Sequence, residues 1–376
     1  MSRIHICMVS AQPIPNLIPI RMEEHKPDLV ILLVSPDMIV EADRIEKAIK
    51  SDGIEVNRIS VKPYDYISMH KTCEGIVERF ADENLILNAT GGTKIMALAA
   101  MDVFRSKGLP VLYVDTQNKT IHQISPEIRP WKFKNVMDVK TYLSVYGQKV
   151  VSSESVIEKT DKYKEVINTL IKNPDKFREA VIDFNRIASR AVKSNKFPHI
   201  VKEIETLTST QAHRELLSLY EKSGLLKKRK RDVVIFRKEG AEFISGGWLE
   251  EYIFGVVKSL NPPDALMRVT VKWDKKGKKP PTNEYDVVFI WNNKLYLIEC
   301  KTKRFMGEDI NSSTSDPIYK LDSLKDWAGG VYGEGIFVSY KGLTEDMKER
   351  LEANKLKYIE GKDIANLKER LHKWLM

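Results

Sequence analysis

The sequence has few cysteines, no long apolar run and no leader-like N-terminus, and each absence narrows the class of protein. Its three cysteines, Cys7, Cys73 and Cys300, are widely spaced, without a CxxC pair or a Cys/His cluster. This spacing argues against a disulfide framework and against a structural zinc site. No apolar run is long enough to span a bilayer, and the first ten residues lack the features of a signal peptide. We therefore expect a cytoplasmic protein with no membrane association.

What the sequence does have is length and positive charge. Its 376 residues exceed one ordinary core, so two or three domains are expected. The net charge is +9, with basic clusters at 227–231 (KKRKR) and at 272–279. Basic clusters attract polyanions, which makes nucleic acid the leading partner class. The alternative is a solvated, lysine-rich surface, and charge alone does not separate the two.

The first 125 residues alternate between short apolar runs and helix-like stretches. The expected strands are Ile4–Val9, Leu29–Val34, Ile54–Val61, Leu85–Leu87 and Val111–Val114, and the expected helices between them are Met38–Lys50, Tyr66–Phe80 and Lys94–Arg105. Continuous apolar strands that alternate with helices indicate a parallel sheet covered on both faces. The fold class is therefore α/β, with a Rossmann-like N-terminal domain whose ligands would lie beyond the carboxyl ends of the strands.

The middle of the chain has a different pattern. After PEIRPW (126–131) the sequence becomes helical and charged, from about Ser155 to Leu226. The stretch 231–244 (RDVVIFRKEGAEFI) predicts a strand, a turn at Glu239 and Gly240, and a second strand. Helices followed by a basic hairpin resemble a winged helix, which could contact nucleic acid. The alternative, which the pattern favours, is a spacer between two domains.

The segment 284–302 (EYDVVFIWNNKLYLIECKT) predicts a hairpin that turns at Asn292 and Asn293. In that register Asp286 lies directly opposite Glu299, and their Cβ atoms would be roughly 4.5–5.5 Å apart. Like charges at that distance repel, and burial makes the repulsion worse. A divalent cation resolves the conflict, since carboxylate oxygens suit Mg²⁺ or Mn²⁺. Lys301 shares this face, where it could orient or deprotonate a water and stabilise charge on a phosphate.

Two alternatives accompany this interpretation. The hairpin end could be an exposed surface ion pair rather than a metal site. The helix-like stretch 246–257 (GGWLEEYIFGVV) offers a third acid, Glu250, which lies beside its apolar stripe, whereas Glu251 is expected on the outer side. Glu250 is then the acid that completes the metal shell, unless it is a solvated residue on the helix flank.

The residues Glu250, Asp286 and Glu299-Cys300-Lys301 resemble the PD-(D/E)xK core of restriction-endonuclease-like nucleases, over about 246–376. The Pro that usually precedes the Asp is absent. The resemblance implies that Asp286 and Glu299 bind metal, that Lys301 is the catalytic lysine and that Glu250 supports the metal. Lys320 and Lys325, on the next helix-like stretch, could anchor phosphates or could be surface lysines.

A second loop, in 85–100 (LILNATGGTKIMALAA), joins a strand directly to a helix through TGGTK. Glycines let the backbone approach a ligand, and a helix N-terminus offers free N–H groups to an anion. The spacing matches neither a Walker loop nor GxGxxG, so an ATPase or an NAD-binding enzyme is disfavoured. A tight turn that binds nothing is the alternative.

This loop resembles the signature of CARF domains, the sensors of cyclic oligoadenylates in type III CRISPR immunity, over roughly 1–140. The resemblance implies a pocket shared by two protomers. Its expected contacts are Ser10 and Gln12 after the first strand, Ser35 after the second, and Thr90, Gly91, Gly92, Thr93 and Lys94 in the loop itself.

Together the two resemblances cover nearly the whole chain and resemble CRISPR ancillary nucleases of the Card/Can type. They imply a CARF-like sensor at 1–140, a connector at 141–245 and a nuclease at 246–376. They also imply a homodimer, switched on by cyclic tetra-adenylate, that cuts RNA and/or DNA with Mn²⁺ or Mg²⁺. The main alternative is a non-enzymatic, ligand-responsive transcription factor that binds DNA through the connector. A further one is a sensor domain that degrades its own ligand.

Overall fold

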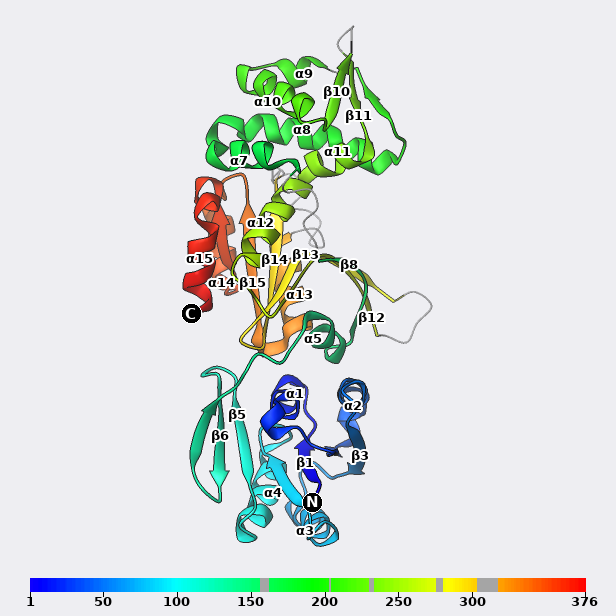
Figure 1. The fold of residues 1–376 in the computed structure, drawn as a ribbon, viewed down its shortest axis with the longest axis vertical. Helices are drawn as coiled ribbons and strands as arrows, with labels where there is room; N and C mark the ends of the chain where they lie inside the picture. Colours follow the sequence, from blue (N-terminus) through cyan, green and yellow to red (C-terminus); the bar gives the residue numbers. More distant parts are fainter. Residues whose placement is uncertain (156–161, 203, 230–232, 275–279, 303–316) are drawn as a thin grey trace.

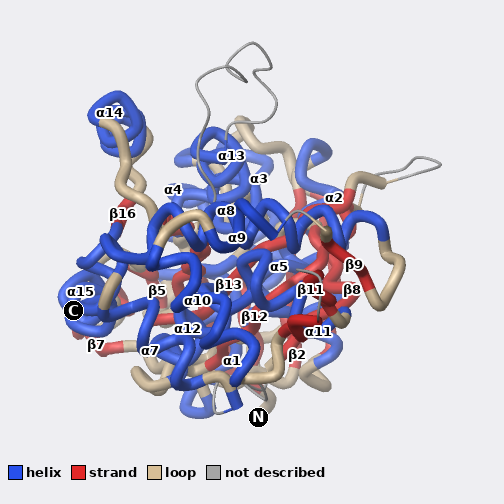
Figure 2. The backbone as a smooth tube through the Cα atoms, turned by 90° about the horizontal axis from the view of Figure 1, so that it is seen from above, coloured by secondary structure: helices blue, strands red, loops and turns tan. Residues whose placement is uncertain are grey.

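The computed structural model describes residues 1–155, 162–202, 204–229, 233–274, 280–302 and 317–376. The molecule is elongated, with the N-terminal sheet at one end, a mainly helical part at the other and a second large sheet between them (Figure 1). Viewed along the long axis, most strands lie toward the inside, and helices occupy much of the outside (Figure 2). No helix among the described residues is long and apolar enough to cross a membrane.

The N-terminal part is a seven-stranded sheet in the order β3-β2-β1-β4-β5-β6-β7. Its strands are β1 (Arg3–Met8), β2 (Leu29–Val34), β3 (Glu55–Ser60), β4 (Asn84–Asn88), β5 (Val111–Asp115), β6 (Thr120–Ser125) and β7 (Arg129–Lys132). The strands from β3 to β5 pair in parallel, whereas β6 and β7 are antiparallel additions at one edge. This is the predicted Rossmann-like order, with its switch point between β1 and β4.

Helices cover both faces of this sheet. The helices are α1 (Ile14–Arg21) and α2 (Ile39–Ser51) on one face, and α3 (Tyr66–Arg79) and α4 (Lys94–Ser106) on the other. The five predicted strands and three predicted helices are all present, within one or two residues at each end. β1, β2, β4 and β5 were predictable because each contains a continuous apolar run, as a doubly covered parallel sheet requires, whereas the edge strand β3 (EVNRIS) is mostly polar. The sequence prediction did not include α1.

The second large sheet has six strands in the order β16-β15-β14-β13-β12-β8. They are β8 (Gln148–Glu154), β12 (Asp264–Trp273), β13 (Thr282–Trp291), β14 (Lys294–Lys301), β15 (Gly333–Ser339) and β16 (Lys357–Glu360). The helices around it are α12 (Trp248–Lys258), α13 (Pro317–Gly329), α14 (Glu345–Ala353) and α15 (Leu367–Leu375). Residues 148–154, expected in the connector, therefore form an edge strand of this sheet, paired with β12.

The connector has the element order of a winged helix. The elements are α7 (Lys164–Lys172), α8 (Pro174–Ser194), β9 (His199–Val201), α9 (Ile204–Thr208), α10 (Gln211–Lys222), β10 (Leu226–Arg229) and β11 (Val233–Phe236), with an antiparallel sheet in the order β10-β11-β9. The predicted turn at Glu239 and Gly240 and the strand after it are wrong. These residues form the helix α11 (Lys238–Glu242), where the missing side chain of Gly240 lets the helix lie against the Leu225 carbonyl.

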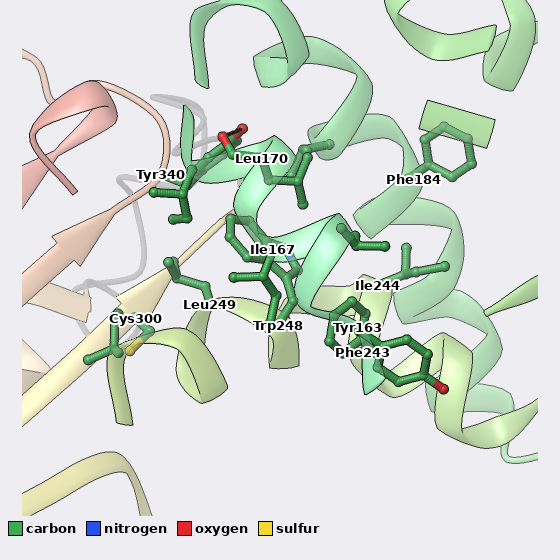
Figure 3. Packing of buried hydrophobic residues seen from close by; sticks show 14 of the residues in the cluster. Tyr163, Ile167, Leu170, Phe184, Phe243, Ile244, Trp248, Leu249, Cys300 and Tyr340 are labelled. Carbon is green, nitrogen blue, oxygen red and sulfur yellow. Dashed lines mark hydrogen bonds between the residues drawn. The ribbon is translucent and has the colours of Figure 1, made fainter. Parts of the chain in front are cut away.

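Apolar contacts join the three parts. Cys7 and Leu32 of the N-terminal sheet belong to the same buried cluster as Leu266 and Leu295 of the second sheet, together with the helix α5 (Val139–Val145) between them. At the other end Trp248 packs edge-on against Tyr340, with ring centroids 5.0 Å apart. Ile167 and Leu170 of α7 lie beside this pair (Figure 3). The basic clusters at 227–231 and 272–279 fall partly outside the described residues.

Candidate functional site

The β13–β14 hairpin has the predicted register. Val287 pairs with Ile298 and Trp291 pairs with Lys294. Asn292 and Asn293 form the two-residue turn with φ of 51° and 57°, the backbone that such hairpin turns require. Because the two strands keep this register, the end of the hairpin far from the turn carries the predicted acids. The β13 and β14 side chains contribute to apolar clusters on both faces of the sheet.

Asp286, Glu299 and Lys301 meet at that end of the hairpin. The Lys301 ammonium contacts the Glu299 carboxylate and lies 3.9 Å from the Asp286 carboxylate. The Asp286 carboxylate also accepts a hydrogen bond of 2.7 Å from the backbone N–H of Cys300. Glu299 is only 4% exposed, so this cluster is no surface ion pair. The alternative of an exposed hairpin end is therefore wrong.

The electrostatics of the cluster favour a bound cation. Burial and, to a smaller extent, the neighbouring negative charge of Glu299 together raise the pKa of Asp286 to about 8. Burial alone would lower the pKa of Lys301, but Glu299 and Asp286 raise it above its ordinary value. When a positive ion binds beside such a carboxyl group, it stabilises the ionised form of the group. Oxygen ligands of this kind suit Mg²⁺ or Mn²⁺.

Glu250 lies on α12, near this cluster but turned toward another cation. Its charge is one of the causes that raise the pKa of Asp286, whereas its own carboxylate accepts a hydrogen bond of 3.0 Å from Arg268. Among the described residues, no three His, Cys, Asp or Glu side chains come together as a ready metal shell. Asp286 and Glu299 fit a divalent cation by their chemistry, and the three-acid shell stays a prediction.

Arg268 is the charged residue of this region that sequence patterns did not indicate. Its guanidinium contacts Glu154 at 2.9 Å, Glu250 at 3.0 Å and Glu251 at 3.2 Å. Its φ is 48°, at a point where the β12–β8 pairing shifts register. The sequence pattern indicated Arg268 only weakly, because an Arg within an apolar strand matches no known motif. Its acidic partners also come from other elements, β8 and α12.

The expected outward position of Glu251 is wrong. Its side chain is 4% exposed against 23% for Glu250. Both acids lie against α12's inner side because Arg268, itself partly buried, provides a cation to each of them. The inner face of the helix was predicted from its apolar residues alone. A charged residue that is buried through an ion pair can lie outside that apolar stripe.

The two lysines of α13 differ in their surroundings. Lys320 lies 3.9 Å from the Glu299 carboxylate and is 43% exposed, so it borders the cluster. Lys325 is instead paired with Asp322 at 2.9 Å and with Asp326 at 3.4 Å. Lys320 is thus the one of these two that could reach a phosphate at the candidate active site.

The second candidate site lies at the switch point of the N-terminal sheet. The loop after β1, with Ser10 and Gln12, and the loop after β4, with Thr90 to Lys94, emerge from neighbouring parallel strands. The loops touch, since a Cβ on Gly91 would lie 2.2 Å from the Met8 carbonyl oxygen and 3.5 Å from the Ser10 hydroxyl. Only glycine permits that approach.

The polar side chains of these loops fall into two groups. Thr90 donates to Asn88 at 2.6 Å and accepts from the Val114 N–H at 2.8 Å, and Thr93 caps α4 by accepting from the Met96 N–H at 3.2 Å. These hydroxyls hold the loop in shape. Lys94, by contrast, is exposed at the first residue of α4.

The remaining predicted contacts differ in burial. Ser35 is buried, at 6% exposure. Gly92 has a φ of 73°, and a Cβ there would lie 2.9 Å from the Met8 Cβ. Asn88 was not predicted; it is buried, and its side chain links Thr90 to the Pro15 carbonyl, to which it donates at 2.9 Å. The sequence signal for Asn88 was a polar residue at the end of an apolar strand.

Comparisons with known proteins agree with both sites. Residues 4–142 match the model of the Card1 CARF domain, and residues 237–376 match that of the Card1-like endonuclease domain. The structure resembles that of Can2 from Sulfobacillus thermosulfidooxidans in complex with cyclic tetra-adenylate, at 29% identity and a TM-score of 0.80, over 99% of each chain. No curated protein matches the sequence.

Two structures with lower sequence identity also share the fold. Protein VC1899 from Vibrio cholerae is 22% identical with a TM-score of 0.89, over 99% of this chain and 98% of that one. A type III CRISPR defence DNA nuclease activated by cyclic oligoadenylate is 16% identical with a TM-score of 0.56, over 94% of this chain and 52% of that one.

A Rossmann-like sensor domain and a buried Asp–Glu–Lys cluster on a separate sheet define the class of a CARF-domain endonuclease. The chain belongs to the Card1-like members of that class. The predicted CARF-domain CRISPR nuclease is thereby confirmed, and the alternative of a non-enzymatic transcription factor has no support. The domain bounds 1–140, 141–245 and 246–376 stay a prediction.

Proposed function

We propose that this chain is a nuclease of type III CRISPR defence that cyclic tetra-adenylate activates and that cuts RNA and/or DNA as a homodimer. The observation that carries the proposal is the buried cluster of Asp286, Glu299 and Lys301 at the end of β14. A cytoplasmic location stays a prediction.

In the nuclease domain, Asp286 and Glu299 would hold the cation, Mn²⁺ or Mg²⁺, with Glu250 as the supporting acid. Such an ion supplies Lewis-acid stabilisation of the phosphate and a more acidic bound water. Lys301 keeps a positive charge beside the two acids, where it stabilises negative charge on the scissile phosphate and orients the attacking water. Lys320 would contact the next phosphate.

In the CARF domain, the proposed ligand contacts are the loop residues Ser10, Gln12, Ser35, Thr90, Gly91, Gly92, Thr93 and Lys94. The exposed ammonium of Lys94 and the N-terminal N–H groups of the 13-residue helix α4 suit a phosphate. Can2, which the chain resembles over its full length, was solved with cyclic tetra-adenylate. This likeness supports the same ring size for the activator here.

The outer face of α3 and α4 supports a homodimer. Tyr66, Ile67 and Leu98 on these two helices are 40%, 67% and 52% exposed, and apolar side chains exposed on neighbouring helices can mark an interaction site. The face continues from Lys94 at the start of α4. Pairing two copies through it would bring both ligand loops to the same side of the interface, in the isologous arrangement of a twofold dimer.

The β13–β14 hairpin provides a route between the two domains. Its turn residue Asn293 accepts hydrogen bonds from the backbone N–H groups of Val136 at 2.8 Å and Met137 at 3.2 Å, in the segment that follows the N-terminal sheet. The other end of the same hairpin carries the acidic cluster. A movement of that segment would therefore be passed along two paired strands to the active site.

The test is to incubate the protein with labelled RNA, single-stranded DNA and plasmid, with and without cyclic tetra-adenylate and Mn²⁺. Cleavage should need both additions. Lys301→Ala and Glu299→Ala should each lower the rate by about 10²–10⁴-fold. Cys300→Ala is the matched control, because this buried side chain belongs to the apolar cluster of the opposite face, and it should retain most activity. Cleavage that survives Glu299→Ala would overturn the assignment of the site.

A further inference from the structure

The connector carries a cationic surface next to the candidate active site, to which no role has been assigned. Residues 184–202, from the second half of α8 to the end of β9, contain five Lys or Arg residues and no Asp or Glu. They are Arg186, Arg190, Lys193, Lys196 and Lys202, and all five are exposed. Arg186 is paired at 3.1 Å with Asp183, which directly precedes this run.

A cavity lies within this surface. Its volume is about 370 Å³, and its lining includes Arg190 from α8 and His199 and Lys202 from the β9 region. Ile200, on the edge strand β9, also lines it and is 57% exposed. Two basic side chains and an imidazole around an open cavity suit a phosphate group. The exposed Ile200 offers an apolar contact to the sugar or base beside that phosphate.

The same helix that carries Arg190 contacts the catalytic strand. The Asn185 side chain donates hydrogen bonds of 2.5 Å to the Thr302 hydroxyl and to the Ser245 carbonyl. Thr302 directly follows Lys301. In Figure 1, α8 lies across the ends of β13 and β14. Since a helix rises about 1.5 Å per residue, Arg190 begins roughly 8 Å further along α8 from Asn185, which is a spacing of one or two nucleotides.

The helix α10, which follows the shorter helix α9, is a weaker candidate for this role. In helix-turn-helix proteins the second helix of the motif usually contacts nucleic acid. In this chain α10 carries Glu215, paired with Lys176, and Lys222, paired with Glu165. Its charges are therefore balanced by neighbouring helices. The cavity beside β9, by contrast, brings the basic side chains of Arg190 and Lys202 together with His199, which favours it as the site for a polyanion.

We propose that the cavity between α8 and β9 binds the sugar-phosphate backbone of the nucleic acid substrate, one or two nucleotides from the bond that is cut. Arg190 and Lys202 hold one phosphate, and the strand continues from there along α8 to the cluster of Asp286, Glu299 and Lys301. The proposal rests on the proposed nuclease function for the identity of the bound strand. It gives the winged-helix connector a binding role in place of a spacer role.

The experiment measures binding and cleavage separately. The variant Arg190→Gln/Lys202→Gln removes both cations without introducing acids, and Arg190→Glu/Lys202→Glu reverses them. The control is Lys368→Glu/Lys373→Glu on the exposed face of α15, which changes the net charge by the same amount as the reversal. Thermal unfolding of all four proteins shows whether each variant is folded.

Binding is followed by fluorescence anisotropy with a labelled single strand of about 30 nucleotides, in EDTA so that no cleavage occurs, at several salt concentrations. The glutamine variant should bind about tenfold more weakly, and its plot of log K against log salt should be shallower by about 0.7, because one single-strand phosphate contact is lost. The reversal should weaken binding further, and the α15 control should match wild type.

Cleavage is then measured with Mn²⁺ and cyclic tetra-adenylate on the long strand and on a dinucleotide, whose only phosphate is the one that is cut. The glutamine variant should have a raised KM on the long strand and an unchanged rate on the dinucleotide, which has no second phosphate for the cavity. Equal affinity and equal salt slope for wild type and the glutamine variant would overturn the inference. If wild type binds the strand through this cavity yet cuts nothing, the proposed nuclease function fails and the binding surface stands.

Discussion

The side-chain carbonyl of Gln12 accepts a hydrogen bond from the Tyr146 hydroxyl at 2.9 Å. The same oxygen lies 3.4 Å from the backbone N–H of Val331, which donates to it. Gln12 belongs to the candidate ligand loop, Tyr146 follows α5, and Val331 follows α13 in the nuclease domain. Gly330 allows the approach, since its φ is 54° and a Cβ there would lie 2.5 Å from the Gln12 oxygen. The sensor loop and the nuclease domain are therefore in direct contact.

This contact predicts that Tyr146→Phe weakens the coupling between ligand and nuclease. A hydrogen bond of this kind contributes about 0.5–1.5 kcal/mol, so the stimulation of cleavage by cyclic tetra-adenylate should fall by about 2–10-fold. The Kd for the ligand in the isolated binding assay and the rate without ligand should change less. Tyr358→Phe, which removes a hydroxyl bonded to Glu352 at 3.4 Å, is the control. Unchanged stimulation in Tyr146→Phe would show that the contact transmits nothing.

A second prediction concerns the cation shared by Glu250 and Glu251. In Arg268→Met the two acids lose their partly buried partner, which should lower the free energy of unfolding by about 3 kcal/mol, because the carboxylate of Glu251 stays buried without its cation. Glu250 also loses its fixed orientation, so the Mn²⁺ concentration for half-maximal cleavage should rise by about tenfold or more. Denaturant unfolding and a metal titration measure the two effects.

Arg58→Met is the matched control for Arg268, because Arg58 also contacts two acids, Asp43 and Glu46, but on the surface of the N-terminal domain. Arg58→Met should lower the free energy of unfolding by at most about 1 kcal/mol and leave the metal titration unchanged. If Arg268→Met has the same metal requirement as wild type, Arg268 stabilises the fold without positioning Glu250.

A third prediction follows from His5, in the centre of β1. The side chain is fully buried, and neither ring nitrogen has a hydrogen-bond partner among the described residues. Burial, with the charges of His25 and Arg3, lowers the pKa of His5 from 6.5 to about 3. The unfolded chain binds a proton at pH 6.5, whereas the folded chain does so only near pH 3. Stability is therefore fully present above pH 6.5 and is lost as the pH falls toward 3, by about 1.4 kcal/mol per unit.

His5→Leu removes this titration. Urea unfolding of wild type and variant at pH 7.5 and pH 5.5 should show that the stability difference in favour of the variant grows by about 1.4 kcal/mol on the acid side. Other titrating groups are the same in both proteins and cancel from that difference. A difference that is equal at the two pH values would contradict the prediction.

The fourth prediction tests the homodimer. In Ile67→Asp/Leu98→Asp, the proposed interface on α3 and α4 would bury four carboxylates in place of apolar side chains. Each apolar side chain contributes about 1.5–3 kcal/mol when buried, so the dimer dissociation constant should rise by more than about 100-fold. Analytical ultracentrifugation measures the change. Ile128→Asp, at an 85% exposed position away from these helices, should leave the association state unchanged; a dimer that persists in the double variant would exclude this face.

Much of the candidate active site could be predicted because it rests on local rules. The turn at Asn292 and Asn293 sets the register of the hairpin, and the alternation of side chains along a strand then places Asp286 near Glu299 and Lys301. The same holds for the loops after β1 and β4. Parallel strands end at one edge, so their loops must meet once the strand order is known.

Other features depended on contacts between distant segments. Glu251 is buried because Arg268, 17 residues away, supplies a cation. Residues 239–244 are helical rather than extended because Gly240 packs against the loop after α10. Neither partner is visible in the local pattern of polar and apolar residues, which is the information that a helix or strand prediction uses.

The sequence by itself determined the two domain types, the hairpin register and the identity of the acid–acid–lysine cluster, since each follows from backbone geometry over a few residues. The tertiary structure decided which cations face those acids, how Gln12 contacts the nuclease domain, and where α8 lies relative to β14. These depend on packing between elements far apart in the chain, such as the hydrogen bond from Asn185 to Thr302 across 117 residues. The local pattern of polar and apolar residues does not predict such contacts.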